Sequence, residues 1–306
     1  MPSVGIDRPA VCSYPRDVRG RGGGWLRGTT ALAACVLVAG CSSGAQDGPA
    51  PDRGPATTTA AATTAPDTAT DPVDPTQALR ERCLSAIPDD ADLEALTLQG
   101  RTGGVLEAAR IGPPTHDTVA VLLPQVGGLC GWGRWASQAA DRVGLTSLLV
   151  NPCGYGASEC PAAADADRLD EVEPAVRLAR EQYGASRVVL LGTSMGGSLT
   201  VMAVAAGADV DAWVDVSGPP SWEGVDLTDL ADDLAADGVP EGLVVMAPSD
   251  GRAIFAAARR LARVSGVPFV AGRSGHGWDL LVDPVDGHLT RIGRRLLALA
   301  TGPGRG

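Results

Sequence analysis

The sequence contains no lysine, so arginine supplies all 25 of its basic residues, and 36 acidic residues outnumber them. The absence of lysine indicates a bias toward GC-rich codons and carries no information about mechanism. Residues 1–40 hold five of the arginines and two aspartates, which leaves 20 basic and 34 acidic residues, a charge near −14, in the rest of the chain. A balance this acidic argues against phosphate-rich partners, so we expect no binding to nucleic acid.

The apolar run near the N-terminus, TTALAACVLVAGC (29–41), is too short to span a bilayer as a stable helix. The arginines before it are typical of a signal peptide: Arg16, Arg19, Arg21 and Arg27. The run ends in Val38-Ala39-Gly40-Cys41, which resembles the lipobox of bacterial lipoproteins. That resemblance implies removal of residues 1–40, acylation of Cys41, and a lipid-anchored protein on the extracytoplasmic side of the cell membrane. A plain signal peptide or an uncleaved anchor is the alternative.

Large apolar residues are nearly absent from residues 41–76, where Ala, Thr, Pro and Asp dominate and Val73 is the exception. Such a segment buries too little surface to offset its ordering entropy, so we expect a disordered tether behind Cys41. The remaining span, 77–302, is long enough for one domain with a substantial core.

Four cysteines remain after the signal peptide and the lipidated Cys41: Cys83, Cys130, Cys153 and Cys160. An even number in a chain that leaves the cytosol predicts two disulfides, and three pairings are possible. We favour Cys153–Cys160, which closes a small loop, together with Cys83–Cys130. No Cys-x-x-Cys pair occurs and the three histidines lie far from these cysteines in sequence, so we expect no metal site.

Buried-strand and helix patterns alternate through the domain. A hairpin pattern at 95–112 surrounds two glycines. Further strands are predicted at 118–124, 146–152, 186–192, 211–218, 242–248 and 267–272, and helices at 135–144, 161–185, 195–206, 251–264 and 291–300. This order predicts an α/β fold with a mostly parallel sheet covered by helices on both faces. In such sheets, ligands bind at the carboxyl ends of the strands.

Ser194 lies in a Gly-x-Ser-x-Gly pattern, for which we expect roughly 0.3 chance matches in a chain so rich in glycine. The pattern also occurs at 40–44, where nothing suggests a catalytic site. Ser194, however, stands where a predicted strand turns into a helix, a context that holds a nucleophile at the helix N-terminus. The alternative, a phosphate-binding turn, lacks a Gly-x-Gly-x-x-Gly motif. We therefore predict Ser194 as the nucleophile.

A serine nucleophile needs a base, and the chain has three histidines. His116 precedes a predicted strand and so lies at the amino edge of the sheet, while His288 precedes the last helix. His276 follows the last strand and lies at the carboxyl edge, so it is the predicted base.

An acidic residue must orient that histidine. Asp250 follows the strand at 242–248 and is the best candidate. Asp215 competes, but it falls inside a predicted strand, and Asp279 is interpreted as a helix N-cap.

Residues from about 95 to 300 resemble the α/β-hydrolase family, with the order Ser194, Asp250, His276. LLPQVGGLCGW resembles the family's oxyanion loop, although Pro124-Gln125 stand where His-Gly is common. NPCGYGASE resembles the turn after the next strand, with Cys153 in place of arginine, and SGHGWDLL resembles the loop that delivers the histidine. The resemblance implies oxyanion donors at the backbone N–H of Met195 and of Val126, or Gln125 if the alignment shifts.

That family likeness implies a serine hydrolase acting on a small or lipid-like carboxylic ester or related acyl compound, as a monomer without cofactor. The insert after the strand at 211–218 is too short for a large lid domain, and we expect a modest pocket near Trp132, Trp222 and Trp278. Its aspartates disfavour anionic substrates: Asp226, Asp229, Asp232, Asp233 and Asp237. Amidase or acyltransferase activity with the same triad, or a non-catalytic binding module, are the alternatives.

Overall fold

The computed structural model describes residues 74–236 and 238–302. The expected signal peptide, Cys41 and the tether up to residue 73 lie outside these residues. Within them, no helix combines the length and the apolar character needed to cross a bilayer. Helix α1 (Pro75–Cys83) is the first described element, so the last two residues of the expected tether are helical.

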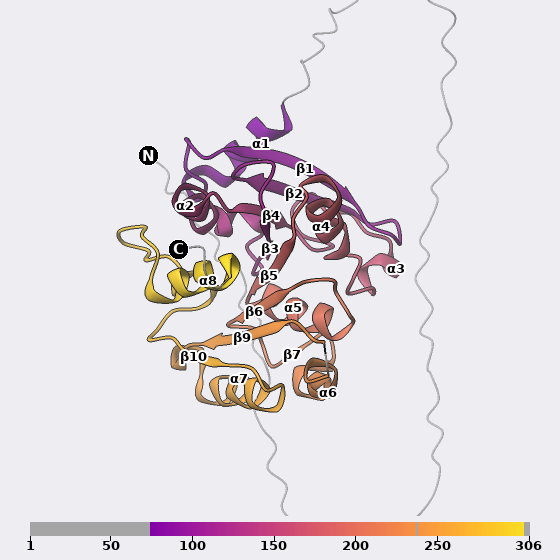
Figure 1. Ribbon diagram of the computed structural model, residues 1–306, viewed down its shortest axis with the longest axis vertical. Coiled ribbons are helices and arrows are strands. Elements are labelled where there is room, and N and C mark those ends of the chain that lie inside the picture. The colour runs from indigo at the N-terminus through magenta and orange to yellow at the C-terminus, as the bar shows by residue number, and fades with distance from the viewer. Residues whose placement is uncertain (1–73, 237, 303–306) are drawn as a thin grey trace, which may run out of the picture. The chain divides into compact units, whose positions relative to one another are not determined.

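An eight-stranded sheet forms the centre of the domain, in the order β1-β2-β4-β3-β5-β6-β9-β10 (Figure 1). Its strands are β1 (Leu93–Gln99), β2 (Val105–Ile111), β3 (Thr118–Leu123), β4 (Thr146–Val150), β5 (Arg187–Thr193), β6 (Ala212–Val216), β9 (Glu241–Met246) and β10 (Phe269–Ala271). β1 and β2 pair antiparallel, as β2 does with β4, and all other neighbours are parallel. The predicted hairpin and mostly parallel sheet are confirmed.

Alternate residues of the central strands enter two separate cores, one on each face of the sheet. In β3, Ala120 and Leu122 belong to one core, while Val119, Val121 and Leu123 belong to the other. Every residue of β3 is buried because helices cover both sides, which explains its continuous apolar sequence.

The larger helices divide between these faces. Those on the Ala120 side are α1, α2 (Gly133–Val143) and α8 (Arg291–Thr301). Those on the other side include α4 (Glu173–Arg177), α5 (Met195–Ala205), α6 (Ala231–Leu234) and α7 (Arg252–Val264). Shorter elements complete the described chain: η1 (Leu84–Ala86), η2 (Leu129–Trp132), α3 (Ala162–Asp165), η3 (Leu178–Gln182), β7 (Ser221–Trp222), β8 (Val225–Asp226), η4 (Leu227–Leu230), η5 (Pro248–Asp250) and η6 (Gly277–Leu280).

The long amphipathic helix predicted at 161–185 is wrong, because α3, a turn, α4 and η3 replace it. Two acidic residues in the turn point inward instead of forming a solvated face. Asp170 accepts a hydrogen bond from the Thr102 N–H at 2.7 Å, and Glu171 accepts one from the Cys153 N–H at 2.8 Å. These carboxylates satisfy backbone donors of distant loops, so the chain bends to deliver them.

Both favoured disulfides are formed, Cys83–Cys130 and Cys153–Cys160. The two disulfides close loops of very different length, since their cysteines are 47 and 7 residues apart in the chain. The first fastens α1 to the segment after β3, and the second closes the loop after β4.

Breaking the two disulfides separately will have unequal effects on stability. Loop-closure entropy predicts a loss of about 4 kcal/mol for Cys83→Ser/Cys130→Ser and about 2.5 kcal/mol for Cys153→Ser/Cys160→Ser. Urea unfolding of both double variants, followed by tryptophan fluorescence, measures the difference. Equal losses, or a larger loss from the short loop, would contradict the entropic account.

Candidate active site

Ser194 occupies a sharp turn between β5 and α5, with backbone angles φ 50° and ψ −119°. A non-glycine residue adopts this left-handed region only when its surroundings enforce it. Its N–H donates to the Val216 carbonyl of β6 at 2.8 Å. A Cβ at Gly192 would overlap the Gly196 carbonyl oxygen, and a Cβ at Gly196 would overlap the Leu123 carbonyl oxygen. The glycines of the motif are therefore required by close backbone approach.

The loop after β3 lies against the first turn of α5, because the Gly196 N–H donates to the Pro124 carbonyl at 3.0 Å. Within the described chain, the backbone N–H groups of Met195, Gln125 and Val126 donate to no protein acceptor. Met195 begins α5, where unpaired N–H groups and the helix dipole favour negative charge. The N–H groups predicted as oxyanion donors, Met195 with Val126 or Gln125, thus have no protein acceptor in the described residues.

His276 and Asp250 meet although 26 residues separate them: Nδ1 of His276 lies 2.8 Å from Oδ1 of Asp250. The Asp250 side chain is 7% exposed, whereas that of His276 is 46% exposed. Asp250 ends η5 after β9, and His276 follows β10, so adjacent parallel strands deliver both residues to one edge. This pair is the one predicted from the sequence.

Two serine hydroxyls hold the glycines on either side of His276. Ser249 Oγ donates to the Gly275 carbonyl at 2.9 Å and accepts from the Gly275 N–H at 3.1 Å. Ser217 Oγ accepts from the Gly277 N–H at 3.1 Å. Both glycines have positive φ, 106° and 55°, so the loop depends on these outside contacts for a defined shape.

Among the described residues, no hydrogen bond joins Ser194 Oγ to the His276 ring. Their neighbours nevertheless pack together. A Cβ at Gly277 would lie 3.6 Å from Cβ of Thr193 and would overlap Oε1 of Gln125. The loop that carries His276, the turn at Ser194 and the loop after β3 therefore converge.

No protein-family model and no curated protein matches the sequence. Solved structures do match: an esterase from Pyrococcus furiosus has a TM-score of 0.55 at 10% identity, over 71% of this chain and 91% of that one. Est1E from Butyrivibrio proteoclasticus with bound ferulic acid gives 0.51 at 14% identity, over 66% and 96%. The esterase domain of a Rhodothermus marinus protein gives 0.50 at 18% identity, over 68% and 98%. The chain has the α/β-hydrolase fold.

Asp215, the competing acid, is buried inside the α/β-hydrolase sheet, with 1% of its surface exposed. Its Oδ1 accepts from the Gly218 N–H at 2.8 Å, and Oδ2 has no partner. Burial raises the pKa of Asp215 to about 7, opposed only by that N–H. Asp215 therefore supports the turn after β6 and makes no hydrogen bond to His276 in the described structure.

The other candidates occupy unrelated positions in the α/β-hydrolase fold. His116 lies before β3, and its Nδ1 accepts from the Thr118 N–H at 3.0 Å. His288 is exposed in the turn before α8. The expected N-cap role of Asp279 is wrong, because Asp279 lies within η6 and the residue before that helix is His276.

The three tryptophans differ in environment. Trp132 is fully buried and donates to the Leu123 carbonyl at 2.9 Å, so its expected place in a pocket is wrong. Trp278 is half-buried and its ring packs on Gly127 and Gly131 in the segment after β3. Trp222 is also half-buried, and its indole N–H, like that of Trp278, has no partner in the described structure.

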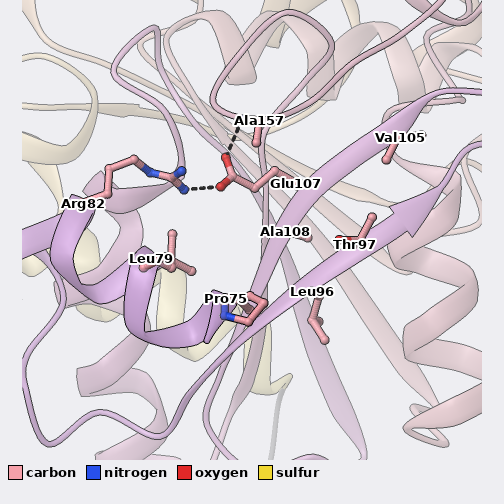
Figure 2. Close-up of a pocket in the computed structure, with 11 residues that line it drawn as sticks. Pro75, Leu79, Arg82, Leu96, Thr97, Val105, Glu107, Ala108 and Ala157 are labelled. Atoms are coloured by element: carbon pink, nitrogen blue, oxygen red, sulfur yellow. Dashed lines mark hydrogen bonds and ion pairs between the residues drawn. The ribbon is translucent and has the colours of Figure 1, made fainter. Parts of the chain in front are cut away.

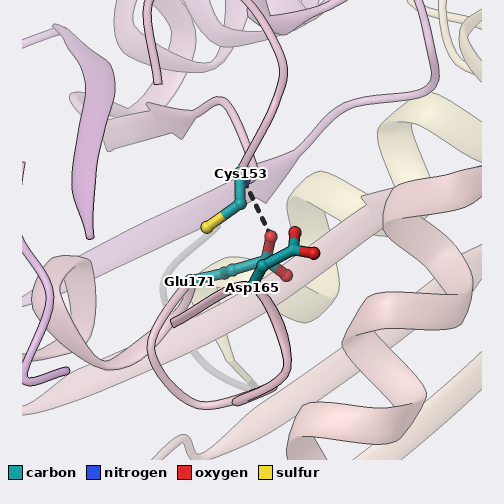
Figure 3. Close-up of side chains that lie close together, drawn as sticks. All are labelled: Cys153, Asp165 and Glu171. Carbon is teal, nitrogen blue, oxygen red and sulfur yellow. Dashed lines mark hydrogen bonds between the residues drawn. The ribbon is translucent and has the colours of Figure 1, made fainter. Parts of the chain in front are cut away.

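Cys153, Asp165 and Glu171 bring three ligand atoms close together (Figure 3). The cluster does not suit a metal ion, because the Cys153 sulfur is bonded to Cys160 and cannot act as a thiolate. Glu171 instead binds the Cys153 N–H, and burial raises the pKa of this carboxyl to about 7. The Glu171 carboxyl therefore lies in this cluster because it holds the loop that carries Cys153.

Asp215→Asn will make stability less dependent on pH. The folded protein holds a proton on Asp215 up to about pH 7, whereas the unfolded chain releases it near its ordinary pKa of 3.8. The wild type therefore loses stability as pH rises through this window, and asparagine, which resembles the protonated carboxyl, does not. Urea unfolding at pH 5 and pH 8 measures the change, with the exposed Asp141→Asn as control. Identical pH slopes for wild type and Asp215→Asn would contradict it.

Proposed function

We propose that this protein is a serine hydrolase that cleaves a carboxylic ester or related acyl compound through Ser194, His276 and Asp250. The observation that carries the proposal is the hydrogen bond between His276 and Asp250. The loop that carries His276 packs against the strained strand-to-helix turn of Ser194, since Gly277 lies against Thr193. Two of the structurally similar proteins are esterases, which supports the reaction class without identifying the substrate.

In the acylation step, Ser194 Oγ attacks the carbonyl carbon while Nε2 of His276 takes the serine proton. Oδ1 of Asp250 accepts from Nδ1–H, which holds the ring in the tautomer that leaves Nε2 free and stabilises the imidazolium. The tetrahedral oxyanion is bound by the N–H of Met195 and of Val126 or Gln125.

His276 then donates that proton to the leaving alcohol as the ester C–O bond breaks, which leaves the acyl-enzyme. In the second step, His276 takes a proton from the water that attacks the acyl-enzyme and returns it to Ser194 Oγ as the bond between serine and acyl group breaks. The products are an alcohol, a carboxylic acid and free Ser194, and only side chains, backbone and water take part. An amine or alcohol in place of that water would make the protein an amidase-like enzyme or an acyltransferase.

The insert after β6 contributes to the choice of substrate. It forms the β7–β8 ribbon, η4 and α6, and its described aspartates are exposed: Asp226, Asp229, Asp232 and Asp233. Asp237 lies outside the described residues. We propose that these carboxylates repel anionic substrates and favour neutral esters.

We further propose that the enzyme is a monomer held at the extracytoplasmic face of the membrane by lipid on Cys41. The lipid anchor rests on the sequence of residues 16–41, where arginines precede the apolar run and Cys41. A non-catalytic binding module with the same fold is the alternative, and loss of Ser194 or His276 would then have no chemical consequence.

A fluorophosphonate probe will label the wild-type protein, and Ser194→Ala and His276→Ala will abolish labelling. The reason is that only a serine activated by its base attacks phosphorus at a useful rate. Gel fluorescence measures the label, and circular dichroism checks each fold. The exposed Ser274→Ala will keep full labelling. A folded, disulfide-bonded wild type that stays unlabelled would favour the binding module.

Ser249→Ala will lower kcat for a p-nitrophenyl ester by roughly tenfold, a part of the 10²–10⁴-fold effect of a general base. Loss of both hydrogen bonds to Gly275 frees the loop that carries His276. Ser249→Thr keeps the hydroxyl and will restore most activity, whereas Ser274→Ala, on the same loop, will have no effect. A kcat unchanged in Ser249→Ala would remove Ser249 from the catalytic support.

A further inference from the structure

The oxyanion loop departs from the family pattern at Pro124-Gln125, yet both of its ends are fixed by hydrogen bonds. Its first end is held by the Gly196 N–H on the Pro124 carbonyl. At its second end, the Leu129 N–H donates to Oδ1 of Asn151 at 2.7 Å. A Cβ at Gly128 would lie 3.3 Å from the same oxygen, so the asparagine amide lies directly against the loop.

Asn151 follows β4 and is 2% exposed. Only one orientation of its amide gives both the oxygen and the nitrogen a hydrogen-bond partner. Nδ2 donates to Oε2 of Glu107 at 2.7 Å while Oδ1 accepts from the loop. A flipped amide would place its oxygen against a carboxylate and its NH₂ against an N–H. Glu107 therefore dictates which way the Asn151 acceptor points.

Glu107 lies on β2 and is itself held from three sides. Its Oε2 also accepts from the Ala157 N–H at 2.9 Å, and its Oε1 forms an ion pair with Arg82 of α1, as Figure 2 shows. These groups border a cavity of about 350 Å³ between α1 and the β1–β2 hairpin. A Cβ at Gly156 would overlap both the Glu107 carboxylate and the Asn151 amide, so a glycine is required there.

Helix α1 reaches the same loop by a second, covalent route. Cys83, the neighbour of Arg82, is bonded to Cys130, the neighbour of Leu129. Two consecutive residues of α1 thus support two consecutive residues at the end of the oxyanion loop. Arg82 supports Leu129 through the Glu107–Asn151 pair, and Cys83 supports Cys130 through the disulfide.

We propose that Asn151 and Glu107 are positioning residues for the oxyanion loop and that Arg82 of α1 belongs to the same support. The proposal rests on the proposed function. An oxyanion donor acts only when it lies at hydrogen-bonding distance from the oxygen of the transition state, and its removal costs 10²–10³-fold in kcat. Release of the loop end moves the donors without deleting them, so we expect a loss of roughly 10- to 100-fold.

The experiment compares full-length variants with a p-nitrophenyl ester, after counting active sites with the fluorophosphonate probe. Asn151→Ala will lower kcat per active site by roughly 10- to 100-fold with KM unchanged, because the loss falls on the transition state. Its affinity for a trifluoromethyl ketone, which forms a tetrahedral adduct, will fall by the same factor. Arg82 is the most exposed residue of this support, so Arg82→Ala will lower kcat per active site by a smaller factor.

A partner exchange separates positioning from folding. Asn151→Asp keeps the acceptor for the Leu129 N–H but sets two carboxylates against each other, and will lose activity. Adding Glu107→Gln restores a donor opposite that carboxylate and will recover part of kcat, because the new NH₂ no longer accepts from the Ala157 N–H. Glu94→Gln is the matched control, since this glutamate lies on the same hairpin, pairs with Arg110 and does not touch the loop. It will keep wild-type kcat.

Three results would overturn the proposal. Folded Asn151→Ala with wild-type kcat per site would remove Asn151 from the support. Fewer active sites with unchanged kcat per site in Asn151→Ala and Arg82→Ala would show that these residues serve folding alone. A wild type that neither labels nor hydrolyses the ester would defeat the proposed function and this role with it, whereas an active wild type with insensitive variants defeats only this role.

Discussion

A serine forced into a left-handed backbone conformation is the constraint on which the rest of the domain depends. Holding Ser194 at φ 50° costs on the order of 1–3 kcal/mol, which the surrounding structure must offset. The offset comes from β5 at the middle of the sheet, from α5, which is buried along most of its length, and from the hydrogen bond between Ser194 and Val216. The strain places the serine hydroxyl at the edge where the strands end.

Close backbone approach around this turn explains why small residues dominate α5. Gly196 touches the loop after β3, and a Cβ at Gly197 would overlap the Asp215 carboxylate beneath it. The helix thereby contacts the oxyanion loop and the turn after β6 at once. Larger side chains at these positions would separate the three segments whose convergence makes the site.

Buried and half-buried carboxyl groups hold the surrounding loops. Asp215 holds the turn after β6, Glu171 the loop after β4, and Glu107 the Asn151 amide under the oxyanion loop. Burial of such a group is costly unless hydrogen bonds compensate it. The cost is visible in the raised pKa values of Asp215 and Glu171, about 7 in each case. A protein with so many acidic residues thus uses some of its carboxyl groups as internal support.

The α/β architecture can be predicted from residue patterns, because continuous apolar strands such as β3 are buried on both faces and leave a distinct pattern. The same patterns identify Ser194, Asp250 and His276 as candidates, since each follows a strand at the same edge. The course of residues 161–185 depends on contacts between distant segments, because an acidic helical pattern is the same whether its carboxylates face water or accept from distant N–H groups. The same limit applies to Asn151 and Glu107, which lie 44 residues apart in sequence. A hydrogen bond between residues so far apart forms only once the sheet has formed, so no local sequence pattern predicts it.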